Sequence, residues 1–174
     1  MLYTTLTVYC KYTALASINN ITKMADNNEI DVINFYRAGD AYGCFSNFSR
    51  HAVWLKDKRW PTSEHYFQVN SIISIRTSDS SKKAQKFPDT KFEELIRNAR
   101  DPGDSARLGR DRSKPLRKDW EEVKDEIMRQ VVYAKFTQHK DLREILLSTK
   151  NALLVEHTVN DSYWGDGTIF KSFR

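Results

Sequence analysis

The spacing of apolar and polar positions along the chain predicts a small number of short strands. Ile30–Tyr36 is rich in β-branched and aromatic residues and predicts a first strand. Ala52–Leu55 and Arg59–Trp60 flank the polar residues Lys56–Lys58, a pattern that predicts a hairpin. Leu153–Val155 predicts a further short buried strand or loop. Any sheet built from these segments is small.

Helix signals begin at Pro61, Thr62 and Ser63, because proline is tolerated in the first turn of a helix and hydroxyl side chains cap it. Thr90 and Glu93 match a capping box, and apolar residues at helical spacing accompany them. These apolar residues are Phe92, Leu95, Ile96 and Ala99. The sequence therefore predicts one helix from Thr62 and another from about Thr90.

Two more helices are predicted in the second half of the chain. Asp101–Asp104 is a turn-forming stretch that ends the preceding helix. Asp119 and Glu122 form another cap, at the start of a long helix. Its apolar stripe and assigned core residues are Trp120, Val123, Ile127, Met128, Val131, Ala134 and Phe136. A last helix is predicted from about Asp141 to Thr149. Its inward-facing residues are predicted to be Leu142, Ile145 and Leu146. Short strands with several helices predict a mostly helical α+β domain.

The composition is that of a globular domain without membrane helices or metal motifs. The chain has 174 residues, 40% of them hydrophobic and 29% charged, which suits one domain. No apolar run approaches the ~20 residues of a membrane helix. The cysteines are Cys10 and Cys44, and the histidines are His51, His65, His139 and His157. Because neither set has metal-ligand spacing, we expect free thiols, no metal and no cofactor.

The first residues of the chain predict an extension rather than part of the domain. Residues 1–24 contain no acidic residue and two lysines, but they also lack arginine, so they are only a weak targeting signal. Met24 is an alternative start. We expect residues 1–28 to be poorly ordered and residues 29–174 to form the domain. The expected location is the cytoplasm, with a plastid as the alternative.

Positive charge is concentrated in one short segment. The net charge is +5. The basic residues of the segment are Arg107, Arg110, Arg112, Lys114, Arg117 and Lys118. Such a segment attracts phosphate or nucleic acid, although charge runs are also common in solvated loops. The spacing of Arg107, Arg110 and Arg112 around Gly109 can direct guanidinium groups at one anion.

Two clusters combine carboxylates with aromatic rings. Glu64 follows a helix-start signal, where the backbone N–H groups and the helix dipole stabilise its ionised form. Its neighbours are Trp60, His65, Tyr66 and Phe67. The second cluster is Asp161–Gly167. A charged carboxylate among flat rings suits a cationic or oxocarbenium-like species. The alternative interpretation is a capped helix and an Asp-Gly turn with core aromatics.

Taken together, these motifs resemble the NADAR family, the YbiA-like proteins. The resemblance covers about Ile30 to Gly167. The matching pieces are Ile33–Tyr36, Tyr42–Gly43, Phe45–Phe48, Trp60–Gln68, Ala106–Arg110, Arg112–Trp120, Leu154–Glu156, Asp161 and Tyr163–Gly167. The resemblance implies a compact α+β fold and an N-glycosidase activity. Members split the bond between a pyrimidine amine and phosphoribose in early riboflavin-biosynthesis intermediates, and others act on ADP-ribose conjugates such as ADP-ribosylated guanine.

The resemblance also implies a set of site residues. By motif, the candidate catalytic residues are Glu64, Trp164 and Asp166. The candidate substrate-binding residues are Asn47, Phe48, Tyr66, Lys86, Arg107, Arg110, Arg112 and Tyr163. Breaking an N-glycosidic bond places positive charge on the ribose, so Glu64 is expected to stabilise that charge or act as a base. Asp166 is expected to bind water or a ribose hydroxyl, and the arginines a 5′-phosphate. Glu156 is a rival carboxylate or a structural ion-pair partner.

Two departures from the family pattern lower the expected activity. Val69–Lys83 separates Gln68 from Ala84 and is expected to be an insertion. The chain is also expected to be truncated after Gly167, where the family continues with a final helix. The alternatives are therefore an inactive isoform, a hydrolase of ADP-ribose conjugates, or a nucleic-acid-binding module, which is not favoured. The favoured partner is a small phosphoribosylamino-pyrimidine or ADP-ribose-type substrate. We expect no association with a membrane.

Overall fold

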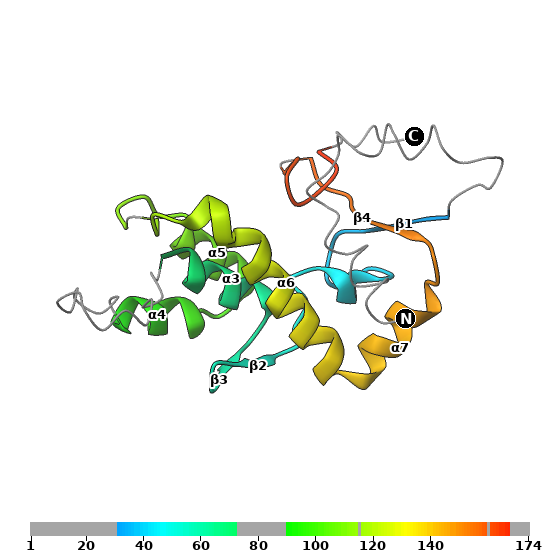
Figure 1. The fold of residues 1–174 in the computed structure, drawn as a ribbon, viewed down its shortest axis with the longest axis horizontal. Coiled ribbons are helices and arrows are strands. Elements are labelled where there is room, and N and C mark those ends of the chain that lie inside the picture. Colours follow the sequence, from blue (N-terminus) through cyan, green and yellow to red (C-terminus); the bar gives the residue numbers. More distant parts are fainter. Residues whose placement is uncertain (1–30, 73–89, 115, 160, 168–174) are drawn as a thin grey trace. The chain divides into compact units, whose positions relative to one another are not determined.

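The computed structural model describes residues 31–72, 90–114, 116–159 and 161–167. Within these residues the chain is mostly helical and has two small sheets of two strands each (Figure 1). It divides into two compact units. One is Arg50–Gln138, and the other combines the residues up to Ser49 with those from His139 onward. The mostly helical α+β prediction is confirmed, with two separate sheets in place of one.

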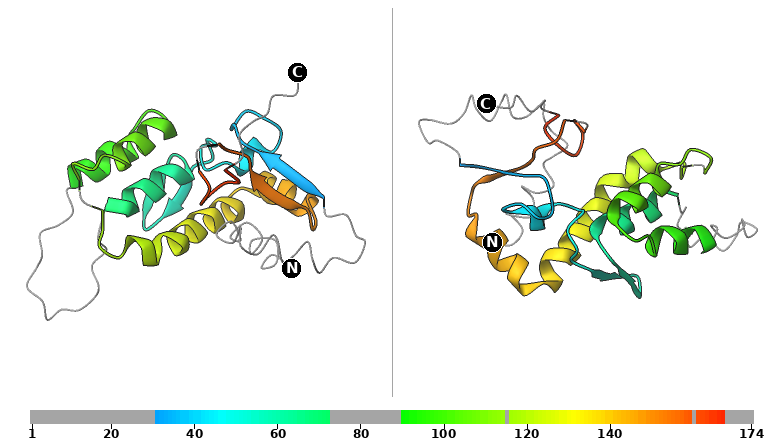
Figure 2. Two further views of the ribbon diagram at one scale, coloured as in Figure 1. Left: turned by 90° about the horizontal axis from the view of Figure 1, so that it is seen from above. Right: turned by 180° about the vertical axis from the view of Figure 1, so that it is seen from behind.

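In the described residues of the unit Arg50–Gln138, a hairpin is followed by four helices. The elements are β2 (Val53–Leu55), β3 (Lys58–Trp60), α3 (Ser63–Ile72), α4 (Thr90–Arg97), α5 (Pro102–Gly109) and α6 (Trp120–Gln138). Helix α3 contacts α4, α5, α6 and β3, and the views in Figure 2 show it among these helices. Residues 63–71 of α3 are all buried, as expected for a helix covered on every side.

The hairpin confirms its predicted position and is held against α6. Strands β2 and β3 are antiparallel, with Val53 opposite Trp60. Lys56 and Asp57 both have positive φ, 52° and 60°, as the two central residues of a tight hairpin turn require. The side-chain amide of Gln138 binds the backbone of Trp54 twice, at 2.8 and 2.9 Å. The last residue of α6 therefore pairs with the β2 backbone in the manner of a neighbouring strand.

The other unit contains a parallel strand pair. β1 (Val32–Phe35) pairs with β4 (Leu153–Glu156), with Phe35 opposite Glu156 (Figure 1). Among the residues of this unit that the structure describes, the other two elements are the 3₁₀ helix η2 (Gly43–Phe45) and α7 (Lys140–Ser148). The backbone N–H of His157 donates to Phe35 O at 2.8 Å and extends the ladder by one residue. Leu153–Val155 is thus a strand, one of the two alternatives predicted.

Helix α5 is a correction to the sequence-based prediction. The stretch Asp101–Asp104 ends the preceding helix, as predicted, but it also begins the next one. Asp101 accepts a hydrogen bond from the backbone N–H of Asp104 at 2.9 Å, and Pro102 occupies the first turn. Proline and aspartate are as typical of a helix start as of a helix stop. The first part of the basic segment is therefore helical.

Further corrections concern individual side chains. Ile145 was predicted to face inward but is 37% exposed, while Leu142 and Leu146 are buried. Asp119 lies just before α6, but its carboxylate binds the Arg117 guanidinium through two hydrogen bonds of 2.6 and 2.7 Å. Residues 69–72, the first part of the predicted insertion, form the last turn of α3. The remainder of that segment lies outside the described residues.

Candidate functional site

Glu64 lies in the first turn of α3 and is only 6% exposed. Its Oε1 accepts a hydrogen bond of 2.7 Å from Nε2 of Gln68, one turn further along the helix. The start of α3 is fixed by Thr62, whose Oγ1 accepts from the backbone N–H of His65 at 3.4 Å. The helix dipole at this end favours a negative charge. The structure thus places a buried carboxylate at the N-terminal end of α3, where the helix dipole opposes the cost that burial imposes on its charge.

The aromatic residues beside Glu64 form a core rather than an open stacking surface. Trp60 and Tyr66 meet edge to face, with ring centroids 5.2 Å apart, and Trp60 Nε1 donates to Leu55 O at 3.0 Å. Phe67 packs on Trp120 at 4.9 Å. Tyr66 has no exposed surface, and burial raises the pKa of its hydroxyl. The prediction that Tyr66 contacts substrate is therefore corrected to a packing role.

The His65 ring is held by two neighbours, one that accepts a hydrogen bond and one that donates. Its Nε2 lies 3.3 Å from the backbone oxygen of Ala99, which can only accept, so Nε2 carries the proton. Nδ1 lies 2.8 Å from Thr62 Oγ1 and accepts from that hydroxyl. Burial lowers the pKa of His65 below 6.5, although the hydrogen bond to Ala99 opposes this. His65 is therefore a neutral, structural histidine that fixes the start of α3.

The loop that carries Asn47 and Phe48 is shaped by Gly43. A Cβ on Gly43 would lie 2.2 Å from Arg37 O, so only glycine fits there. The Tyr42 and Phe45 rings stack at 5.7 Å. Phe45 is buried, whereas Phe48 is 39% exposed and Asn47 is half-buried. Phe48 is therefore accessible to a ligand in this unit.

Asp166 is fixed by the residues that follow β4. Its Oδ2 lies 2.6 Å from Nδ1 of His157, and its Oδ1 accepts from the backbone N–H of Thr158 at 3.1 Å. Its own backbone N–H donates to Glu156 O at 3.1 Å. A Cβ on Gly165 would lie 2.3 Å from Thr158 Cγ2, so glycine permits this close approach. The turn thus presents a carboxylate with a fixed orientation.

Trp164 and Tyr163 are ordered by a second carboxylate. Oδ1 of Asp161 accepts from the backbone N–H groups of Tyr163 and Trp164, at 2.9 and 2.8 Å. The two rings meet edge to face at 4.9 Å. Tyr163 is 36% exposed and Trp164 is half-buried. Both predicted site aromatics are therefore accessible within their unit.

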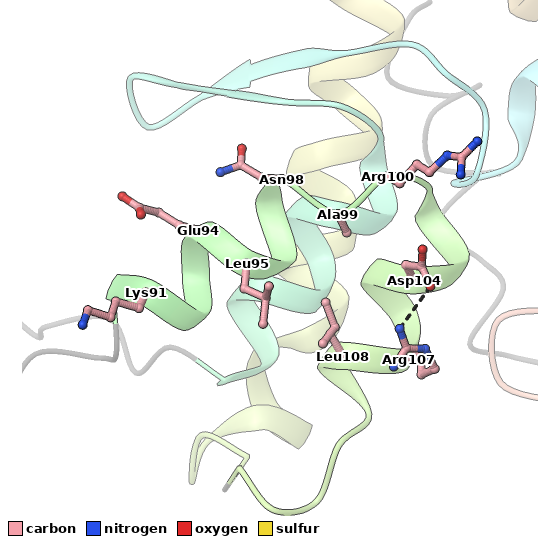
Figure 3. A pocket seen from close by; sticks show the side chains of 9 residues that line it. All are labelled: Lys91, Glu94, Leu95, Asn98, Ala99, Arg100, Asp104, Arg107 and Leu108. Atoms are coloured by element: carbon pink, nitrogen blue, oxygen red, sulfur yellow. Dashed lines mark hydrogen bonds and ion pairs between the residues drawn. The ribbon is translucent and has the colours of Figure 1, made fainter.

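The predicted arginines are exposed, and one of them is already paired. Arg107 binds Asp104, one turn earlier on α5, at 3.1 Å. It also lines an open hollow of about 470 Å³, where Leu95 of α4 and Leu108 of α5 point toward each other (Figure 3). Glu64 is not among the nine lining residues. Arg110 and Arg112 are exposed at and after the end of α5. Lys86 lies outside the described residues.

Sequence reasoning missed the partners of the two carboxylates. Gln68 belongs to the Trp60–Gln68 motif but had no assigned role, and His157 was counted only as a scattered histidine. The i, i+4 spacing of Glu64 and Gln68 on a predicted helix was a usable signal. His157 and Asp166 are nine positions apart, and their contact depends on a chain reversal between them. The periodicity of apolar residues does not predict such a chain reversal.

The described residues hold no obvious metal site or membrane helix. In the part of the chain that the structure describes, no group of three or more His, Cys, Asp or Glu side chains could hold a metal ion. No helix there is long and apolar enough to cross a membrane.

Comparison with known proteins gives consistent matches over most of the chain. Residues 34–172 match the model of the NADAR domain. N-glycosidase YbiA of Escherichia coli is 53% identical over 136 residues, which cover 78% of this chain and 76% of YbiA. N-glycosidase Npun_R5314 of Nostoc punctiforme is 44% identical over 135 residues, 78% of this chain and 79% of that protein.

Two further matches concern a plant protein and a solved structure. The chloroplastic riboflavin biosynthesis protein PYRR of Zea mays is 34% identical over 148 residues, 80% of this chain but 22% of that protein. The NMR structure of Escherichia coli YbiA superposes with a TM-score of 0.65 at 46% identity. The superposition covers 83% of this chain and 77% of that one.

Proposed function

The chain belongs to the NADAR family, and on this premise we propose that it is an N-glycosidase acting on early intermediates of riboflavin biosynthesis. The bond it would hydrolyse is the C–N bond between a pyrimidine amine and phosphoribose. The observation that carries the proposal is Glu64, a buried carboxylate at the start of α3 with a fixed hydrogen-bond donor. Its relatives include two N-glycosidases and a riboflavin biosynthesis protein.

The chemistry requires stabilisation of a cation. As the C–N bond breaks, positive charge develops on the ribose C1 and ring oxygen, and the departing amine gains electron density. A carboxylate oriented before the reaction stabilises that charge without reorganising, and it can also orient or deprotonate the attacking water. We assign this role to Glu64. Because Glu64 is buried, its charge is screened less than a surface charge would be.

Asp166 is proposed to bind the attacking water or a ribose hydroxyl. Its orientation is set by His157 and by the backbone of Thr158. The exposed edge of Tyr163 and the half-buried Trp164 are proposed to contact the base. Asn47 and Phe48 are proposed to contribute further substrate contacts from their loop.

For the 5′-phosphate we propose Arg110 and Arg112 ahead of Arg107. All three are exposed, but Arg107 forms an ion pair with Asp104 within α5. A phosphate must compete with that carboxylate for Arg107. A single guanidinium group can donate two hydrogen bonds to two oxygens of one phosphate. Either Arg110 or Arg112 alone therefore suffices for a specific contact.

We propose a small-molecule substrate and a cytoplasmic location, with a plastid as the alternative. Expression of the chain as a fluorescent fusion, beginning at Met1 or at Met24, separates these locations. Import that requires residues 1–23 would favour the plastid.

The direct test is hydrolysis of a phosphoribosylamino-pyrimidine by the full chain. The measured quantity is the amount of ribose 5-phosphate released. The assay uses a high enzyme concentration and single-turnover conditions, so that slow hydrolysis is also detected. ADP-ribosylated guanine serves as the competing substrate. Release from the pyrimidine intermediate supports the proposal. Release only from the ADP-ribose conjugate, or none from a folded protein, overturns it.

A further inference from the structure

We infer that Gln68 is a positioning residue for Glu64 and that Gly109 of α5 holds Gln68 in place. This inference rests on the proposed function, since it concerns the carboxylate assigned to charge stabilisation. It brings together residues of two helices in contact, α3 and α5. All three lie in the unit Arg50–Gln138.

The bond between Gln68 and Glu64 is short and shielded from water. Nε2 of Gln68 lies 2.7 Å from Oε1 of Glu64, and the two residues are 5% and 6% exposed. They are four positions apart, so their side chains project from the same face of α3. A hydrogen bond to an ionised acceptor is stronger than one between neutral groups, and a low local dielectric strengthens it further. This hydrogen bond therefore stabilises the observed orientation of the Glu64 carboxylate.

Gly109 leaves the room that the Gln68 side chain occupies beside α5, while the Glu64 carboxylate, which only accepts hydrogen bonds, selects the NH₂ end of the amide. A Cβ built on Gly109 would lie 2.1 Å from Oε1, 2.8 Å from Cδ and 2.7 Å from Cβ of Gln68. These distances are shorter than any that real Cβ atoms adopt. Gly109 lies at the end of an α-helix and does not have positive φ, so glycine is required there for space rather than for backbone freedom. The amide oxygen occupies that space, and the NH₂ group lies on the side of Glu64.

This arrangement has a catalytic consequence. An amide turned by 180° would place its oxygen against the Glu64 carboxylate, where two acceptors repel each other. With the observed orientation, the donor favours the ionised carboxylate and restricts its rotamers. Catalytic groups need to be held to about half an ångström, and a supporting residue of this kind supplies that restraint. Gln68 is thus expected to affect the rate of the chemical step more than substrate binding.

Kinetics of Gln68→Leu test this role, because leucine has a similar volume but no donor. We expect kcat to fall about 10- to 100-fold with KM within about twofold. In the Glu64→Gln background, Gln68→Leu should lower the residual rate no further, since its effect acts through the Glu64 carboxylate. A structural role would instead lower the rate by the same factor in both backgrounds. That result, or unchanged kcat in the single variant, would overturn the inference.

The Gly109→Ala variant tests the contribution of α5. The added methyl group displaces the Gln68 amide, so we expect the same loss of kcat as for Gln68→Leu. Gly39→Ala is the matched control, because a Cβ there meets nothing within 4 Å. Equal kcat for Gly109→Ala and wild type would overturn the role of Gly109. If Gly109→Ala does not fold, the Gln68→Leu comparison still decides the role of Gln68.

An amide NMR spectrum separates this inference from the proposed function. In the wild type, one Nε2 proton of Gln68 should be shifted downfield and slow to exchange, and Glu64→Leu should abolish both effects. This result with no hydrolysis of any substrate would leave the hydrogen bond established and the proposed function wrong. Gln68 amide signals that do not respond to Glu64→Leu would overturn the inference even in an active enzyme.

Discussion

Nδ1 of His157 lies 2.6 Å from Oδ2 of Asp166, so the carboxylate is bound by a histidine that directly follows β4. The other oxygen, Oδ1, accepts from the backbone N–H of Thr158 at 3.1 Å. The carboxylate is thus tied at both oxygens to one segment of its unit. Such double anchoring fixes the direction in which Asp166 can interact with a substrate or water.

Asp166→Asn should therefore reduce catalysis while leaving the fold intact. The amide replaces one accepting oxygen by a donor and removes the charge, so kcat should fall by about 10²–10⁴-fold. Ser162→Ala is a control in the same turn, because Ser162 is exposed. The measurement is single-turnover hydrolysis together with thermal unfolding. Equal rates for Asp166→Asn and wild type would remove Asp166 from the catalytic residues.

Glu64→Gln tests the carboxylate on which the proposed function depends. Glutamine is nearly isosteric but carries no charge to stabilise the developing cation, so a loss of roughly 10²–10⁴-fold is expected. The melting temperature should stay close to that of the wild type, since the position remains polar and hydrogen-bonded. Unchanged turnover in a variant that unfolds like the wild type would exclude this role for Glu64.

The parts of the fold that the sequence predicted are those determined by local patterns. The hairpin, the starts of α3 and α4, and the long helix α6 follow from residues close together in the chain. The start of α5 at Pro102 was missed, because proline beside aspartate both ends and begins helices. The pairing of β1 with β4 was also missed. It joins Phe35 to Glu156, which lie far apart in the sequence, and local sequence patterns do not predict such a contact.

The candidate site was predicted as a set of residues but not as a set of contacts. Glu64 and Asp166 were selected by motif, whereas Gln68 and His157, which bind them, were not. Tyr66 was selected as a substrate contact because aromatic rings suit both stacking and cores. Its complete burial distinguishes the two, and burial depends on packing between helices that the chain's own sequence does not display.

Arg110→Ala tests phosphate binding by the basic segment. One charge-assisted contact to the 5′-phosphate should be lost, so KM for the phosphorylated substrate should rise about tenfold or more, with a smaller change for the dephosphorylated analogue. Arg107→Ala should have the weaker effect, because Arg107 is paired with Asp104. Equal changes in KM for both substrates would point to a structural role for Arg110.

His65 predicts a specific dependence of stability on pH. Burial lowers its pKa in the folded state below the ordinary value of 6.5. Between the folded-state pKa and 6.5 the unfolded state binds more protons, so stability is greatest above pH 6.5 and falls as the pH is lowered through that window. Urea unfolding at several pH values, for wild type and His65→Gln, measures the effect. The stability advantage of the wild type should shrink below pH 6.5, and a constant advantage would contradict the prediction.

Arg117 connects the last turn of α3 to the start of α6. Its backbone N–H donates to Ser71 O at 3.0 Å, and its buried guanidinium binds the Asp119 carboxylate, whose pKa these hydrogen bonds lower. The last turn of α3 is itself fixed by Asn70, whose Nδ2 donates to Tyr66 O at 2.7 Å. These contacts make residues 70 and 71, which belong to the predicted insertion, part of the folded unit.

Arg117→Met should therefore destabilise the protein. Methionine keeps much of the side-chain volume but removes the buried guanidinium and its hydrogen bonds to Asp119 and to Asn70 O, so urea unfolding should give a lower free energy of unfolding. Asn70→Ala should lower it as well, since it removes a buried donor from the Tyr66 carbonyl. Lys118→Met is the control, because Lys118 is exposed beside the same turn. If Arg117→Met and Asn70→Ala are both as stable as that control, the last turn of α3 does not contribute to the stability of the unit.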